Sequence, residues 1–393
     1  MSSLVSAKLK DLVDNFDNQR VPLSVKQRST LEKRFRYYGA QGVIDYVDNY
    51  IFDGEYILVA EDGENLKSQK NNICNYVTGK FWVNNHAHII RANKNNNTKY
   101  LYYALNLVNF RNYVTGSAQP KLTKDNLGEI VLHVHKGDEQ KKIASVISAL
   151  DAKIELNNRI NAELEAMAKT LYDYWFVQFD FPDANGKPYK TSGGTLVYNP
   201  TLKREIPEGW SDKTLSEIAN ITMGQSPEGS SYNDEGVGTI FYQGSTDFGW
   251  LFPTTRQYTT APSRMAKKGD ILLSVRAPVG DMNIANTDCC IGRGLAALNS
   301  KTGSDGFLFY VMKYFKQIFD RRNSEGTTFG SITKNDLHSL TLAYPTSDLL
   351  KKYDEIVTNY NKMIFERSLE NRELIALRDW LLPMLMNGQV TVE

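Results

Sequence analysis

The stretch that decides the fold runs from Asp138 to Trp175 and reads DEQKKIASVISALDAKIELNNRINAELEAMAKTLYDYW. It contains neither proline nor glycine and is rich in Ala, Leu, Ile, Lys and Glu, which favour helices. Steps of four and three residues from its first isoleucine give an apolar seam interrupted by two asparagines: Ile143, Ile147, Leu150, Ile154, Asn157, Asn161, Leu164, Ala168, Leu171 and Trp175. As a single helix the stretch would be about 57 Å long. An apolar stripe of this length predicts a partner helix, in this chain or in another.

A second stretch of the same chain repeats the pattern and offers that partner. Its seam, read in the same steps, consists of Leu349, Tyr353, Ile356, Tyr360, Met363, Arg367, Glu370, Leu374, Leu377, Leu381 and Met384. The shift that places Asn161 on Asn371 superposes the two stretches without a gap, and it also lays residues 116–132 over residues 326–342. The chain is therefore predicted to be an internal duplication with two related domains rather than a solenoid.

The regions outside the two helices favour strands. Short apolar and β-branched runs, such as YILV at residues 56–59, alternate with turns rich in Gly, Asn and Asp. We predict an α+β fold class, with two mixed, mostly β domains joined by two long coiled-coil helices and an internal repeat. The predicted boundaries are a first domain at 1–137, a helix at 138–175, a hinge at 176–209, a second domain at 210–345 and a second helix at 346–393.

Composition limits the function classes. The net charge is +1, and the helices are more acidic than the two β domains, which is a weak indication that a polyanion would meet the domains. The three cysteines, Cys74, Cys289 and Cys290, form no CxxC motif, which favours a reducing compartment. No segment has the pattern of a signal peptide or a membrane span, so we expect a cytoplasmic protein without a membrane partner.

The sequence contains no recognisable catalytic or cofactor motif. A GxxxxGK[ST] phosphate loop, a [DN]PP[FY] tetrapeptide and a GxGxxG turn are all absent. The pairs His86-x-His88 and His133-x-His135 would each place two rings on one face of a strand, a spacing that metal sites use. No third ligand lies nearby in the sequence, so strand-surface or core contacts are the favoured interpretation. We expect no catalytic residues, no metal and no cofactor bound by this chain.

The block LYDYWFVQFDFPDANGKPYKTSGG from Leu171, followed by LKREIPEGW from Leu202, resembles the central region of specificity subunits of type I restriction–modification enzymes. The resemblance extends over the plan of the whole chain. It implies two target-recognition domains on antiparallel spacer helices with a pseudo-two-fold axis, each domain reading half of a split, asymmetric site on double-stranded DNA through the major groove. It also implies a non-catalytic chain that binds two modification subunits, which carry S-adenosylmethionine and methylate adenine, and two restriction–translocation subunits.

The candidate DNA contacts share a suitable residue type and a position in a predicted loop. Base readout needs Arg, Lys, Asn, Gln, Ser or Thr, and phosphate contacts need cations or hydroxyls. The candidates in the first domain are Arg36, Tyr37, Gln41, Lys80, Asn85, His86, Ser117, Gln119, Lys121 and Lys124. Those in the second domain are Gln225, Ser226, Tyr232, Gln243, Ser245, Arg276, Arg293, Thr327, Thr328, Ser331 and Lys334.

Two features refine this set, and the helix seams add three register candidates. Glycines beside Gln225, Arg276 and Arg293 would allow close backbone approach, which favours these three. Lys124 and Lys334 are equivalent under the repeat, so they suit a sequence-independent phosphate contact, or alternatively they cap the following turn. The seam asparagines Asn157, Asn161 and Asn371 would fix the register of the helices, or alternatively they are solvated.

Two other functions stay open at this point. One is a fused DNA methyltransferase or nuclease with an unrecognised motif, although every cofactor signature is absent. The other is a coiled-coil adaptor that does not bind DNA, which the nearly neutral charge permits. The polar loops differ between the two otherwise matched copies, and a symmetric adaptor would have no use for two different faces.

Overall fold

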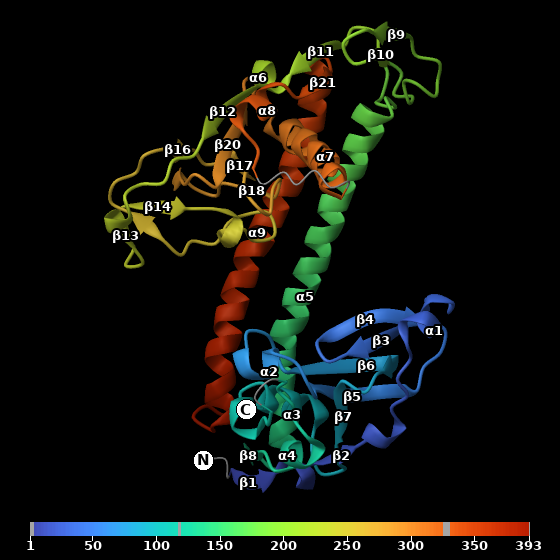
Figure 1. The fold of residues 1–393 in the computed structure, drawn as a ribbon, viewed down its shortest axis with the longest axis vertical. Coiled ribbons are helices and arrows are strands. Elements are labelled where there is room, and N and C mark those ends of the chain that lie inside the picture. Colours follow the sequence, from blue (N-terminus) through green and yellow to red (C-terminus); the bar gives the residue numbers. More distant parts are fainter. Residues whose placement is uncertain (1–3, 117–118, 325–330, 393) are drawn as a thin grey trace. The chain divides into compact units, whose positions relative to one another are not determined.

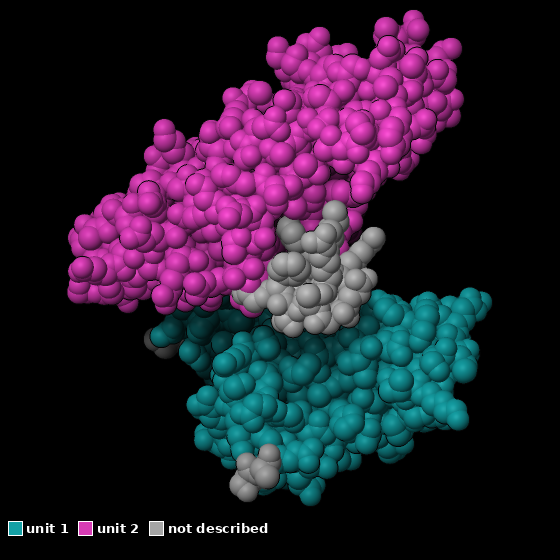
Figure 2. Space-filling model, turned by 45° about the horizontal axis from the view of Figure 1, so that its top comes forward, with its two compact units in different colours: residues 1–154, 373–393 teal, residues 155–372 magenta. Residues whose placement is uncertain are grey.

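The computed structural model describes residues 4–116, 119–324 and 331–392, with side chains left out from 318 to 324 (Figure 1). The chain divides into two compact units, residues 1–154 with 373–393 and residues 155–372 (Figure 2). Each unit contains one mostly β domain and a segment of each of the two long helices, α5 (Asp138–Tyr172) and α9 (Ser347–Met386).

The two long helices run antiparallel in each unit. In the first unit, Arg378 Nη1 lies 3.1 Å from Asp151 Oδ1 in an ion pair. In the second unit the Tyr353 hydroxyl donates to the Ala168 carbonyl oxygen at 3.1 Å. Helix α5 has 35 residues and continues into a π-helical turn, Asp173–Val177, and α9 has 40 residues. The predicted pair of long helices is confirmed.

The first unit is built on one six-stranded sheet. Its order is β2-β7-β5-β6-β3-β4, with β3 and β6 parallel and every other pair antiparallel. The strands are β2 (Val13–Asn15), β3 (Phe35–Gly39), β4 (Gly42–Val47), β5 (Phe52–Ala60), β6 (Cys74–Val83) and β7 (Ala87–Ala92). The helices of this domain are α1 (Val25–Ser29), α2 (Asn65–Ser68), α3 (Thr98–Leu105) and α4 (Lys124–Gly128).

Both faces of this sheet are buried, because side chains alternate along β5. Ile57 and Val59 pack with α3, with Ile143 of α5 and with the end of α9 in one hydrophobic cluster. Tyr56 and Leu58 point the other way and pack with Phe52, Phe81 and other residues of the sheet itself. The β domain and the helix ends of this unit therefore share one core.

A separate pair of strands closes the first domain at its base. β1 (Val5–Lys8) pairs antiparallel with β8 (Val131–Val134), and the Leu9 amide donates to the Ile130 carbonyl oxygen at 2.8 Å. The strand that enters the domain, β1, and the strand that leaves it, β8, therefore lie side by side. Helix α5 begins shortly after β8.

The second unit repeats this plan. β11 (Ser211–Thr214) pairs antiparallel with β21 (Thr341–Tyr344) just before α9, and the Leu215 amide donates to the Leu340 carbonyl oxygen at 2.7 Å. The helices are α6 (Leu215–Ile218), α7 (Asp305–Ser324) and α8 (Lys334–His338). A two-stranded hairpin, β9 (Leu196–Asn199) with β10 (Arg204–Pro207), precedes the domain.

The strands of the second domain form two sheets, with the orders β12-β20-β17-β18 and β13-β15-β14-β19-β16. Their bounds are β12 (Ala219–Met223), β13 (Tyr232–Asn233), β14 (Thr239–Tyr242), β15 (Tyr258–Thr259), β16 (Met265–Ala266), β17 (Ile271–Ser274), β18 (Met282–Ile284), β19 (Cys289–Ile291) and β20 (Leu295–Ser300). Matching pairings show that β18 and β19 together take the place of the single long strand β6. The strand breaks between Ile284 and Cys289, and the sheet divides there.

The two domains therefore share one topology. β14 and β19 are parallel, as are β3 and β6, and β17 and β20 are antiparallel, as are β5 and β7. The predicted α+β class, the two mostly β domains and the internal repeat are confirmed.

Candidate nucleic-acid interface

Backbone hydrogen bonds bring several loops of the second domain together. The Val275 amide donates to the Gly294 carbonyl oxygen at 2.9 Å, and the Ile332 amide donates to the Val275 carbonyl oxygen at 2.9 Å. The Gly292 amide donates to the Tyr242 carbonyl oxygen at 2.8 Å. These bonds join the stretches that carry the candidates Gln243, Arg276, Arg293 and Ser331, all of which are exposed. We call this set of loops the second edge.

Two further candidates are attached to the second edge. The Arg293 amide donates to Ser226 Oγ at 3.3 Å, and the Gln225 amide donates to the Ile291 carbonyl oxygen at 3.0 Å. Arg276 and Ser331 form an isolated antiparallel bridge. Arg276 and Arg293 have no carboxylate within ion-pair distance among the described residues. Their guanidinium groups are therefore available to a ligand.

Two glycines of these loops lie against backbone atoms of the same edge. A Cβ atom on Gly224 would lie 2.2 Å from the Gly292 carbonyl oxygen, and one on Gly294 would lie 2.7 Å from the Gln243 carbonyl oxygen. Backbone atoms leave no room for either addition. These glycines allow the loops of the edge to pack against one another.

The first domain has the corresponding edge. The Glu61 amide donates to the His86 carbonyl oxygen at 2.9 Å, and the Leu122 amide donates to the Glu61 carbonyl oxygen at 2.8 Å. Asp62 and Lys121 form an isolated antiparallel bridge. The candidates on this first edge are Asn85, His86, Gln119 and Lys121, all exposed.

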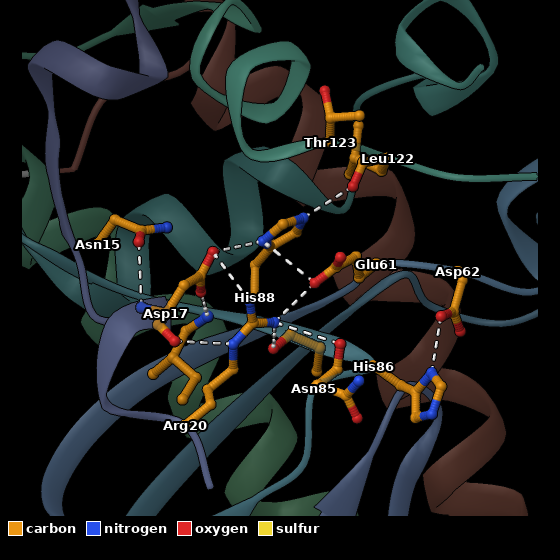
Figure 3. A network of polar contacts seen from close by, with 12 residues as sticks. Asn15, Asp17, Arg20, Glu61, Asp62, Asn85, His86, His88, Leu122 and Thr123 are labelled. Carbon is orange, nitrogen blue, oxygen red and sulfur yellow. Dashed lines mark hydrogen bonds and ion pairs between the residues drawn. The ribbon is translucent and has the colours of Figure 1, made fainter. Parts of the chain in front are cut away.

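A buried network of charged groups lies beneath the first edge (Figure 3). His88 Nδ1 lies 2.6 Å from Asp17 Oδ2, and His88 Nε2 lies 2.8 Å from the Leu122 carbonyl oxygen. Both ring nitrogens of His88 thus lie at hydrogen-bond distance from oxygen atoms, which hold the ring from two sides. Arg20 Nη1 donates to Glu61 Oε2 at 2.6 Å and to the Ala87 carbonyl oxygen at 2.9 Å.

The carboxylates of this network stay ionised. Burial alone would raise the pKa of Asp17, but the hydrogen bond and charge of His88, the Ile89 amide and Arg20 outweigh it, so the pKa lies below its ordinary value. Glu61 behaves in the same way, because Arg20 and His88 outweigh its burial. The network fixes the strand ends that carry the first edge.

The other candidates of the first domain lie on different elements. Arg36 on β3 donates to the Thr78 carbonyl oxygen at 2.8 Å, Lys80 Nζ on β6 lies 4.5 Å from the ring centroid of Tyr50, and Gln41 accepts from Asn65 Nδ2 at 3.2 Å. Tyr37 is 0% exposed, and the Leu23 amide donates to its hydroxyl at 2.9 Å. A side chain without exposed surface cannot reach a base edge, so Tyr37 is withdrawn as a candidate.

Two candidates of the second domain are half-buried. Tyr232 stacks on Phe241 with ring centroids 4.8 Å apart, and its hydroxyl donates to the Pro227 carbonyl oxygen. Ser245 begins a short 3-10 turn. Ser117, Thr327 and Thr328 lie outside the described residues.

Lys124 and Lys334 occupy the first positions of the equivalent helices α4 and α8. The caps of these helices are made by Thr123 and Thr333, whose side chains accept from backbone amides at 3.2 Å. The prediction that the lysines cap the turn is therefore wrong. Both side chains are exposed.

Two residues of the edges were missed by the sequence analysis. Asp62 was overlooked because acidic residues were not considered as base contacts, and its Oδ2 lies 2.7 Å from His86 Nδ1. Arg264 is exposed, and its carbonyl oxygen accepts from the Ile291 amide at 2.9 Å, next to the second edge. The sequence gives no local signal for this proximity.

The paired histidines do not share a face. His86 is exposed and His88 is buried, and His133 is exposed whereas His135 is buried. Among the described residues, no group of three or more His, Cys, Asp or Glu side chains could hold a metal ion. None of the helices in the described part of the chain has the length and apolarity that a membrane crossing requires.

The seam asparagines are buried rather than solvated. Asn157 Nδ2 donates to Asn371 Oδ1 at 2.9 Å and to Glu370 Oε2 at 2.8 Å. Asn371 Nδ2 in turn donates to Asn158 Oδ1 at 2.8 Å. Asn161 is 1% exposed, and its Oδ1 has no hydrogen-bond partner among the described residues. A polar layer thus interrupts the apolar seam of α5 and α9 in the second unit.

Comparison with known proteins places this architecture. The family model for the type I restriction modification DNA specificity domain matches twice, at residues 3–166 and 207–371. A Methanocaldococcus jannaschii protein, provisionally named as the specificity subunit of the type I restriction enzyme MjaX, is 31% identical over 315 residues, which cover 78% of this chain and 71% of that protein. The specificity subunit of the type I restriction enzyme MjaIX from the same organism is 26% identical over 321 residues, 75% of this chain and 70% of that protein.

A solved structure agrees in fold. The S subunit of the type I restriction–modification system from M. genitalium superposes with a TM-score of 0.69 at 16% sequence identity, covering 98% of this chain and 96% of that one. The duplicated domain, the two long helices and the two matches of the family model lead to one conclusion: the chain belongs to the family of type I restriction–modification DNA specificity subunits, whose role is not catalytic.

Proposed function

We propose that each β domain reads one half of a split, asymmetric site on double-stranded DNA, and that α5 and α9 set the distance between the halves. Residues 1–137 and 210–345 would be the two target-recognition domains, 138–175 and 346–393 the spacer helices, and 176–209 the hinge. The two edges would carry the DNA contacts.

The observation that carries this proposal is that the two edges have one backbone and different side chains. Equivalent hydrogen bonds place Asn85 where the second domain has Arg293, and Lys121 where it has Ser331. A shared scaffold with different hydrogen-bond donors and acceptors suits two domains that bind two different DNA sequences. An adaptor without DNA contacts would not require such differences.

A spacer needs a defined length. Helix α5 with 35 residues is about 52 Å long, enough to separate two domains by roughly one DNA turn, about 34 Å. The buried Asn157–Asn371 hydrogen bond favours one axial alignment of the helices, since a slipped pairing would leave amides unpaired.

The helices also carry two exposed apolar patches, Met167 with Tyr174 and Leu377 with Trp380. The shift that places Asn161 on Asn371 places Met167 on Leu377, and these side chains are 52% and 45% exposed. Tyr174 in the second unit and Trp380 in the first are exposed beside them. Exposed apolar surface on a helix indicates a protein contact. We assign one modification subunit to each patch. S-adenosylmethionine would be bound by these partners, and two restriction–translocation subunits would complete the assembly.

The test is adenine methylation mapping in cells that express this chain with a modification subunit. The expected result is a split, asymmetric motif that is methylated on both strands. If the complex forms and no new methylation appears, DNA recognition by the edges is contradicted.

The spacer role has its own test. Four residues inserted after Ala162 in α5, matched by four after Glu366 in α9, lengthen the helix pair by about 6 Å. The gap between the half-sites should grow by about two base pairs, since base pairs are about 3.4 Å apart. An unchanged gap would contradict the spacer role. Four-residue insertions at the exposed Gly186 turn serve as the control.

A further inference from the structure

We propose that Asp62 and Arg276 are equivalent specificity-determining residues, and that each reads one base pair with opposite hydrogen-bonding character. This inference rests on the proposed function of the two edges. It assigns a hydrogen-bond acceptor to the first half-site, where Asp62 would accept from the N4 amino group of cytosine, and a donor to the second, where Arg276 would donate to guanine.

The equivalence of the two positions follows from backbone hydrogen bonds. The residue before Asp62 donates to His86 and accepts from Leu122, and the residue before Arg276 donates to Gly294 and accepts from Ile332. Each of the two residues then forms an isolated antiparallel bridge to the residue that precedes Leu122 or Ile332. Three matched backbone contacts fix each position, so the side chains project from the same point of the fold.

The side chains at this point are opposite in charge. Asp62 presents a carboxylate that only accepts hydrogen bonds when it is ionised, and Arg276 presents a guanidinium that only donates. Their bridge partners differ as well, with Lys121 beside Asp62 and Ser331 beside Arg276. A conserved scaffold position with a reversed charge cannot be a phosphate contact in both domains, because phosphate repels a carboxylate.

Base edges accommodate both kinds of side chain. In the major groove, guanine offers O6 and N7 as acceptors to an arginine, and cytosine offers the N4 amino group as a donor to a carboxylate. The ring of His86 holds one oxygen of Asp62, with His86 Nδ1 2.7 Å from Asp62 Oδ2 (Figure 3). No hydrogen bond or ion pair reaches Asp62 Oδ1 among the described residues, and this oxygen would meet the amino group.

Residues nearby support a base-reading role for this point. Arg276 is exposed and lacks an ion-pair partner among the described residues, and Arg293 and Gln243 lie on adjoining loops of the same edge. The side chain of Asp62 is 24% exposed, so part of it is open to solvent. His86 acts as a positioning residue for it.

The experiment uses the complex of the full chain with its modification subunit and DNA duplexes that carry the mapped target. Each base pair of both half-sites is replaced in turn, and competition binding gives the discrimination at each position. The variants are Asp62→Ala and Arg276→Ala. Matched controls are Asp14→Ala, an exposed carboxylate on β2, and Arg372→Ala, an exposed arginine on α9.

For Asp62→Ala we expect the discrimination at one C·G pair of the first half-site to fall by about tenfold or more, with the other positions and the second half-site unchanged. For Arg276→Ala the same loss should fall on one G·C pair of the second half-site. The half-site that stays unchanged shows in each case that the complex is folded.

Two results would overturn the inference. One is Asp62→Ala keeping its discrimination at every position. The other is a uniform gain in the affinity of Asp62→Ala for all duplexes, which would show that Asp62 only repels the DNA phosphates. A wild-type complex without any split methylated target would instead reject the proposed function itself.

Discussion

Asn157 of α5 and Asn371 of α9 share a buried hydrogen bond of 2.9 Å in a seam that is mostly apolar. The pair has a cost in stability, because buried amides contribute less than packed apolar side chains. The pair also favours one axial alignment of α5 and α9.

The first prediction concerns this pair. Asn371→Leu leaves the Asn157 amide buried without one of its partners and should lower the free energy of unfolding by about 1–3 kcal/mol. The double variant Asn157→Leu with Asn371→Leu should regain stability, because two apolar side chains then face each other. Urea midpoints measured by circular dichroism check both values. A double variant less stable than Asn371→Leu would contradict this account.

The second prediction concerns the pH dependence of the first unit. The pKa of Asp17 lies below its ordinary value in the folded chain, so ionised Asp17 stabilises the fold above the unfolded-state pKa of about 3.9. This contribution is lost as the pH falls through the folded-state pKa. Asp17→Asn should therefore cost about 3 kcal/mol at pH 7 and progressively less in acid, because it removes one partner of a buried pair.

Urea unfolding at pH 7 and at pH 3 measures this difference. Asp14→Asn, at an exposed position of β2, should change neither value and is the control. If Asp17→Asn lowered the free energy of unfolding equally at both pH values, the charge of the Asp17 carboxylate would not contribute to stability.

The third prediction concerns the apolar patches on the helices. Met167→Asp and Leu377→Asp should each remove one modification subunit from the complex, and the double variant should remove both. Both side chains are about half exposed, so the free energy of unfolding should change by no more than about 0.5 kcal/mol. Native mass spectrometry gives the stoichiometry. Ala152→Asp, at another exposed position of α5, should keep two subunits.

The fourth prediction concerns the two equivalent lysines. Lys124→Ala and Lys334→Ala should each weaken binding to all DNA sequences alike and reduce the salt dependence of the binding constant by about one unit of slope. Titrations at several salt concentrations provide the slope. A loss confined to one target sequence would show base readout rather than a phosphate contact.

The sequence predicted one helix seam better than the other. In α5 none of the predicted seam positions is exposed. In α9, Met363 and Leu377 are exposed, and their neighbours on the chain include the buried Ile364. Adjacent apolar residues offer two possible faces in α9, and only packing against α5 and the second domain selects between them.

The edges were harder to predict than the helices. Their candidates are far apart in the chain, and backbone hydrogen bonds such as Val275 to Gly294 and Ile332 to Val275 bring them together. No local sequence pattern predicts such contacts. Tyr37 illustrates the opposite error, because its residue type suited DNA whereas its place in β3 made it part of the core. Selection by cationic and amide side chains also excluded Asp62.

The strand pair at the base of each domain has an evolutionary consequence. The chain leads in and out of the first domain at Leu9 and Ile130, and of the second at Leu215 and Leu340, where a backbone hydrogen bond adjoins the strand pair of each junction. The segment between each pair of points is continuous in the chain and contains no part of either long helix. Under the proposed function, a recombination event that replaces one such segment would change one half-site in a single step and leave the other β domain unchanged.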